Sequence, residues 1–283
     1  MDINLIIGKF VLVVVAAPFI SGLTSKIKNN LRMRHGQPIF QPYYNLRKLF
    51  SKEAIIPENA SWIFAAAPSI VLAAALCATL LLPFPEQIRS SNGVAALLTI
   101  IFILALGRFF QALAGLDAGS AFGGMGSSRE MFVSSYVEPV ACLAIFSLLL
   151  SSAHCSLSAI LTGLAVLTVV LAETSRLPFD NQETHLELTM IHEAMVLDHS
   201  GPLLALIELA GYIRQSFWIV LLASILIPLN SFLALSSAVI ILCFVIALIE
   251  IGIAKFRLFK VPDILMLGFV LALLAVAAGV MRI

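Results

Sequence analysis

The stretch SFLALSSAVIILCFVIALIEIGI, residues 231–253, contains a single charged side chain, Glu250. A helix needs about 20 apolar residues to cross the hydrocarbon core of a bilayer, so this stretch predicts a transmembrane helix. Its apolar residues are continuous and do not alternate with polar ones as in the strands of a membrane β-barrel. Because a helix satisfies its own backbone hydrogen bonds in lipid, we expect an all-α integral membrane protein.

Further stretches of the same character bring the expected number of transmembrane helices to about eight. The other predicted spans are residues 3–23, 61–83, 94–116, 131–151, 156–173, 203–229 and 262–281. Only 12% of the 283 residues are charged and the mean hydropathy is +1.04, whereas about a quarter of a soluble domain is charged. We therefore expect one multi-pass domain over residues 1–283 in a lipid bilayer. The net charge of +1 argues against a nucleic-acid partner.

The distribution of lysine and arginine predicts the orientation of the chain. Most of these residues fall in the loops expected at residues 24–60, 117–130, 174–202 and 254–261. Basic loops stay in the cytoplasm, so we expect these four loops inside and both termini on the outer side of the cytoplasmic membrane. The first and third of these loops are long and polar, which favours a protein partner docking on the cytoplasmic face.

Four carboxylates lie inside or at the end of predicted spans, namely Glu138, Glu173, Glu208 and Glu250. A charge at the centre of a membrane helix costs about 2.5–3.5 kcal/mol on insertion scales, so each one needs a reason. One interpretation is a proton relay, and the other is pairing with a basic residue. The central positions of Glu138 and Glu208 favour the relay, whereas Glu250 is expected to pair with Lys255.

The densest polar cluster follows the fifth predicted span. Residues 173–187 read ETSRLPFDNQETHLE, with Arg176 as their only basic side chain. Glu183 and Glu187 are four residues apart and would share one side of a helix, where mutual repulsion raises the pKa of at least one.

The chain offers no obvious metal site or electron carrier of its own. Its four cysteines are far apart in sequence and form no CxxC pair. His185, His192 and His199 recur every seven residues, but the spacing of two histidines on one helical turn is absent. We therefore expect no cofactor within this chain.

Glycines are concentrated in residues 115–130, GLDAGSAFGGMGSSRE. The segment lacks the lysine of a phosphate-binding loop and follows a predicted membrane helix rather than a strand. Because glycine permits positive φ and close backbone approach, we expect a tight re-entrant or interfacial turn beside a cavity.

Several of these motifs resemble a known family. Residues 173–180, ETSRLPFD, followed by Glu183 and Glu187, resemble the ETNRxPFDxxExExEL signature of respiratory complex I subunit 1, the NuoH type. Residues 34–42 resemble the first cytoplasmic loop of that family. Within it, residues 115–130 and 184–201 resemble the branch found in group 4 membrane-bound [NiFe] hydrogenases, which comprises hydrogenase-4 component C and formate hydrogenlyase subunit 4.

The resemblance implies a non-catalytic membrane anchor that couples electron transfer to proton or sodium translocation. It implies hydrophilic hydrogenase large and small subunits on the cytoplasmic face, which would carry the [NiFe] and iron–sulfur clusters, and antiporter-like subunits in the membrane. By position, the residues of the proton or ion path would be Glu138, Glu173, Asp180, Glu183, Glu187 and Glu208. The loop-ordering and interface residues would be Arg34, Gln41, Asp117, Arg129, Arg176, Pro178, Phe179, Glu193 and Asp198.

The chain departs from the family at positions that border the quinone chamber of complex I. Asn45 stands where the family has aspartate, and Asp198-His199 stands where it has Glu-Tyr. The carboxylate after Gly201-Pro202 comes early, at Glu208. These departures argue against a working quinone site. Two alternatives stay open: a quinone-binding subunit of an NADH:quinone oxidoreductase, and a stand-alone secondary ion transporter, which an inverted repeat would favour.

Overall fold

A computed structural model describes residues 3–83, 88–150, 156–180, 190–226 and 232–281. Within these ranges the chain is helical with short connections and contains no strand, which confirms the predicted all-α class. The membrane-length helices are α1 (Ile3–Leu31), α3 (Trp62–Leu81), α4 (Ser91–Asp117), α5 (Ala121–Leu150), α8 (Gly201–Leu226), α9 (Phe232–Gly252) and α10 (Val261–Met281). The shorter elements are α2 (Gln41–Phe50), the apolar α6 (Leu157–Glu173), α7 (His192–Val196) and the 3-10 turn η2 (Leu258–Lys260).

Each of the eight predicted spans coincides with one of these helices. Seven of the described helices are long and apolar enough to cross a membrane, and α6 is a shorter apolar helix. Three of them begin at serine N-caps, where Ser61, Ser90 and Ser156 accept hydrogen bonds from backbone N–H groups of the first turn. These caps satisfy N–H groups that a helix start leaves without an intrahelical partner.

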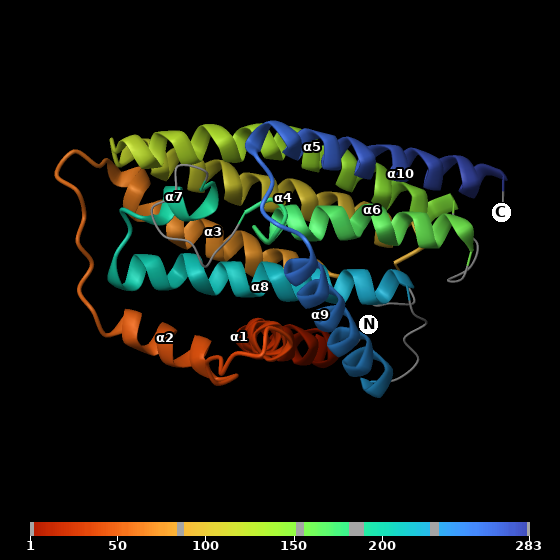
Figure 1. Ribbon diagram of the computed structural model, residues 1–283, viewed down its shortest axis with the longest axis horizontal. Coiled ribbons are helices and arrows are strands. Elements are labelled where there is room, and N and C mark those ends of the chain that lie inside the picture. The colour runs from red at the N-terminus through yellow and green to blue at the C-terminus, as the bar shows by residue number, and fades with distance from the viewer. Residues whose placement is uncertain (1–2, 84–87, 151–155, 181–189, 227–231, 282–283) are drawn as a thin grey trace.

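The helices form an elongated bundle with α8 at its centre (Figure 1). Helices α5, α6 and α10 pack together on one side, and α1, α2 and α9 lie on the other. Helix α8 contacts α1, α3, α6 and α9 and is the most buried of the long helices. Polar side chains on α8 therefore face the interior of the bundle rather than lipid.

The turn predicted over residues 117–130 is wrong in extent. Helix α4 ends at Asp117 and α5 already begins at Ala121. Gly119, with φ of +67°, is the residue of this segment that uses the left-handed conformation open to glycine. Gly123 serves packing instead, because a Cβ there would overlap the backbone carbonyl of Gly115. The glycines thus let α4 and α5 approach closely.

The first cytoplasmic loop is shorter than predicted, because α1 continues to Leu31 rather than ending near residue 23. The loop then contains α2, in which Leu46 is the buried residue while Tyr44 and Phe50 are exposed. In the 174–202 loop, α7 packs against α4 and α5. Residues 181–189 lie outside the described part of the chain, so the predictions for Glu183 and Glu187 concern residues that are not described.

Candidate functional site

Arg108 of α4 lies between two carboxylates of neighbouring helices. Its Nη1 lies 2.8 Å from Oε1 of Glu173 at the end of α6, and its Nη2 lies 3.4 Å from Oε1 of Glu138 on α5. The Arg108 and Glu173 side chains are 6% and 2% exposed, whereas the Glu138 side chain is 38% exposed. One guanidinium thus connects the buried end of α6 to the outer side of α5.

A second buried cluster joins Glu250 of α9 to two cations. Its Oε1 lies 2.5 Å from Nη1 of Arg176, and its Oε2 lies 2.9 Å from Nζ of Lys28 on α1. All three side chains are less than 10% exposed. Glu250 is therefore paired, as expected for a structural carboxylate, but the predicted partner Lys255 is wrong.

Lys255 binds Asp180 instead. Its Nζ lies 2.8 Å from Oδ1 of Asp180, while Oδ2 accepts hydrogen bonds of 3.0 Å from the backbone N–H groups of Ile191 and His192. Both oxygens of this buried carboxylate are thus occupied. Asp180 joins the connection between α9 and α10 to the start of α7.

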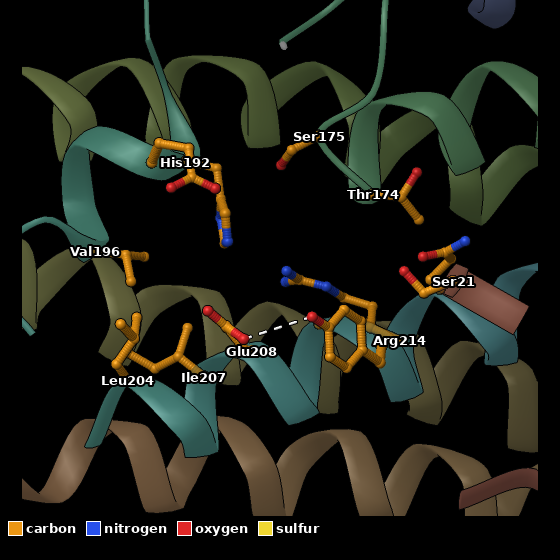
Figure 2. Close-up of a pocket in the computed structure, with 13 residues that line it drawn as sticks. Ser21, Thr174, Ser175, His192, Val196, Leu204, Ile207, Glu208 and Arg214 are labelled. Carbon is orange, nitrogen blue, oxygen red and sulfur yellow. Dashed lines mark hydrogen bonds between the residues drawn. The ribbon is translucent and has the colours of Figure 1, made fainter. Parts of the chain in front are cut away.

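A polar cavity of about 230 Å³ opens between α1, α7, α8 and the segment after α6 (Figure 2). The polar side chains that line it are Ser21, Thr174, Ser175, His192, Glu193, Glu208, Tyr212, Arg214 and Gln215. Arg214 extends from α8 toward the centre of the cavity, beside the Glu208 carboxylate, which accepts a 3.5 Å hydrogen bond from the Tyr212 hydroxyl (Figure 2). Ser175 and His192 face the same space from the opposite wall.

Arg214 is only 9% exposed, and its Nε has no hydrogen-bond partner among the described residues. Its electrostatic neighbours are Glu173, Glu130 and Arg108, so the cavity adjoins the Arg108 cluster. A buried cation is costly unless it is solvated or paired. The cavity has room for several water molecules, which solvate the guanidinium and bring water to the edge of the cluster.

Two histidines near this cavity are neutral at physiological pH. Burial lowers the pKa of His192 to about 4, and the nearby Arg214 charge lowers it further than the Asp180 charge raises it. Burial also lowers the pKa of His199 to about 4, and its ring stacks on Phe64 at a centroid distance of 4.1 Å. His192 therefore faces the cavity as a neutral hydrogen-bonding group rather than as a cation.

Three of the predicted interface residues tie separate segments together. Asp117 Oδ2 accepts hydrogen bonds from the N–H and Oγ of Ser61 and from the Phe64 N–H, which fixes the start of α3. Arg129 Nη1 donates to the Met190 carbonyl at 2.9 Å. The Asp198 carboxylate accepts a 2.5 Å hydrogen bond from Ser120 in the short connection between α4 and α5.

The remaining predicted residues are spread over the same face. Phe179 is 2% exposed and belongs to the main apolar cluster, and the Pro178 carbonyl accepts a 3.1 Å hydrogen bond from the Phe256 N–H. Gln41 donates to Asn45 at 3.0 Å within α2, whereas the Arg34 side chain is exposed. The predicted path residues therefore occupy three neighbouring clusters, around Arg108, around Asp180 and around the cavity.

Sequence analysis overlooked Arg108, the residue that connects Glu138 and Glu173. The available signal was a lone arginine in the apolar stretch LTIIFILALGRFFQALAGL, residues 98–116. By the rule applied to the carboxylates, a charge at that depth requires a partner or a function. Among the described residues no group of three or more His, Cys, Asp or Glu side chains is placed to hold a metal ion.

An all-helical membrane subunit with paired charges inside its bundle is the class of protein that this fold and site define. The chain belongs to the NADH dehydrogenase family, whose model matches residues 3–281. It is 29% identical to hydrogenase-4 component C of Escherichia coli K12, over 95% of this chain and 93% of that protein. It is 28% identical to formate hydrogenlyase subunit 4 of the same organism, over 92% of each chain.

The match to complex I proper is shorter. A membrane component of the NADH-quinone oxidoreductase of Bordetella pertussis is 28% identical over 62% of this chain and 55% of its own length. Among solved structures, a chain of the membrane-bound sulfane sulfur reductase, an archaeal respiratory membrane complex, superposes with a TM-score of 0.78 at 16% identity. This superposition covers 97% of the present chain and 99% of the other, and at this identity it establishes the fold.

Proposed function

We propose that the chain is the membrane anchor and coupling subunit of a complex-I-like membrane-bound [NiFe] hydrogenase or formate hydrogenlyase-type complex. In this role it connects a cytoplasmic electron-transfer arm to proton or sodium translocation. The observation that carries the proposal is the Glu138–Arg108–Glu173 bridge, which connects the start of the acidic segment after α6 to the outer side of α5. The two relatives that match over more than 90% of the chain support the hydrogenase assignment.

The arrangement of charges suits transfer of protons along an acidic path. Carboxylates in a low-dielectric interior change protonation when their cation moves, because the cation favours the charged form. Water in the cavity beside Arg214 supplies the start of the path, from which protons pass by Glu173 to Glu138. Asp180 acts in a different way, as the group that holds α7 and the α9–α10 connection to the path.

The position of Glu138 indicates where the path continues. Its carboxylate is 38% exposed on the isolated chain although it lies within a span. A carboxylate that faces lipid at this depth is costly, so an adjoining membrane subunit covers it in the complex. We assign this place to an antiporter-like subunit.

The opposite partners dock on the side of the predicted cytoplasmic loops. Large apolar side chains are exposed there, including Met33 at 94%, Ile55 at 72% and Phe259 at 91%. Such residues on a face expected to meet water favour contact with another protein. The hydrophilic large and small hydrogenase subunits, with the [NiFe] and iron–sulfur clusters, would occupy this face of the cytoplasmic membrane, and both termini would lie outside.

The test is purification of the native complex in mild detergent, followed by identification of its subunits and analysis of nickel and iron. Co-purification of a nickel-containing large subunit with iron–sulfur partners is the expected result. A nickel-free complex with a flavin-containing NADH module and bound quinone would replace the proposal with the quinone enzyme. A chain that purifies alone would support the secondary transporter instead.

A further inference from the structure

The two contacts of Arg108 are unequal. The 2.8 Å contact with Glu173 is a full ion pair, whereas the 3.4 Å contact with Glu138 is long for a charge-assisted hydrogen bond. The guanidinium is a planar fork that presents several N–H donors at once. In the observed arrangement it therefore stabilises the ionised form of Glu173 more than that of Glu138.

The charges around Arg108 do not balance when every carboxyl is ionised. Glu130 of α5 has Arg108, Arg214, Glu173 and Asp180 as its electrostatic neighbours. Asp180 is already matched by Lys255. The groups left in the cluster are two guanidiniums, Arg108 and Arg214, and three carboxyls, Glu130, Glu138 and Glu173.

One added proton makes this cluster neutral. Arginine stays protonated in proteins, so the two cations are permanent. An unbalanced charge inside a membrane protein is expensive, which favours the neutral count of two cations, two carboxylates and one protonated carboxyl. The cluster therefore has one exchangeable proton, and the position of the guanidiniums decides which carboxyl carries it.

We infer that Arg108 is a positioning residue that directs a single proton to either Glu138 or Glu173. The inference deepens the proposed function, on which it rests. When Arg108 binds Glu173, as observed, the proton is on Glu138. When Arg108 moves toward Glu138, the Glu138 O–H bond breaks, the proton passes through water to Glu173, and a new O–H bond forms there. No electron pair leaves the cluster, and its net charge is the same before and after.

Unused hydrogen-bonding groups support the second arrangement. Arg108 Nε and Glu173 Oε2 are buried without a hydrogen-bond partner among the described residues. Native interiors satisfy most buried polar atoms, so each exception calls for an explanation. Here the free donor and acceptor are the groups that a shifted guanidinium and a protonated Glu173 would use.

The first test reads the proton directly, by the infrared C=O stretch of protonated carboxyl groups in wild-type-minus-variant spectra of the purified complex. We expect Glu138→Gln and Glu173→Gln each to remove the same single band, because the remaining carboxylate then keeps Arg108 to itself and stays ionised. A band that survives either substitution would overturn the sharing of one proton. Loss of the band only in Glu130→Gln would also overturn the inference, because the proton would then belong to Glu130.

The second test replaces the fork while keeping the charge. In Arg108→Lys a single ammonium cannot bind both carboxylates in the same way, so we expect redox-driven ion translocation in proteoliposomes to fall by about tenfold or more. Assembly and redox activity in detergent should persist. The matched control is Arg89→Lys, at a residue whose Nη2 donates to the Ile225 carbonyl away from the cluster. This control should translocate like wild type.

The outcomes separate the two proposals. A wild-type complex that assembles with its redox partners but drives no ion translocation would refute the coupling function, while the infrared prediction would still stand or fall by itself. A wild-type complex that translocates ions, together with an Arg108→Lys variant of equal rate and unchanged carboxyl band, would refute the role of Arg108 alone.

Discussion

Replacement of Glu250 by glutamine should destabilise the protein strongly. The carboxylate is 3% exposed and is the shared anion of Arg176, at 2.5 Å, and Lys28, at 2.9 Å. The neutral amide leaves two buried cations without a counter-charge. Removing one partner of a buried ion pair costs about 3–5 kcal/mol, and here two pairs are lost together. We expect a loss at the upper end of that range, because the two contacts are coupled and their losses do not simply add.

The assay is the thermal denaturation midpoint of the purified complex, together with the yield of assembled protein in the membrane. Glu250→Gln should lower both. The matched double variant Glu250→Gln/Lys28→Met removes one of the stranded cations and should recover part of the midpoint. If the single variant assembles with an unchanged midpoint, or if the double variant is less stable by the sum of the two single changes, the charge-pairing explanation is refuted.

Three further predictions concern other parts of the chain. Glu138→Gln should assemble with a stability change below about 1 kcal/mol, because its contact is long and its side chain partly exposed; ion translocation in proteoliposomes should nevertheless be lost, and a variant that fails to assemble would make Glu138 structural. Asp117→Ala removes the acceptor of three hydrogen bonds at the start of α3 and should cost about 1–2 kcal/mol, seen as a lower denaturation midpoint, whereas an unchanged midpoint would contradict the capping role. Burial lowers the pKa of His199 from 6.5 to about 4, so the unfolded chain binds more protons in that interval, and stability should fall as the pH drops from 6.5 toward 4. His199→Asn should make the dependence of the midpoint on pH shallower over this interval, and an equal slope in both proteins would count against a neutral buried His199.

The transmembrane helices were predictable because length and hydropathy alone decide whether a segment crosses a bilayer. The ends of the helices were less so. Glycine-rich residues 115–130 suit a turn and a close helix contact equally well, and the choice depends on whether another backbone lies opposite, as Gly115 does for Gly123. Similarly, the polar continuation of α1 to Leu31 is helical although its sequence resembles a loop.

The candidate site was predictable as a set of residues but not as a set of pairs. Each buried carboxylate is visible in sequence as a charge in an apolar context. Its partner comes from another helix, so sequence proximity suggested Lys255 for Glu250, whereas the actual partners are Lys28 and Arg176. Arg108 was missed for a related reason: its role is defined by two carboxylates that packing brings together.

The attachment of Lys255 to Asp180 has a mechanical consequence. The Phe256 N–H also donates to the Pro178 carbonyl, so the connection between α9 and α10 is fastened to the acidic loop at two adjacent points. Helix α10 in turn packs along α5 and α6, which carry Glu138 and Glu173. A push on the loop from the cytoplasmic side is therefore transmitted along α10 as along a rod, and it arrives at the far side of the bundle without passing through the charges themselves.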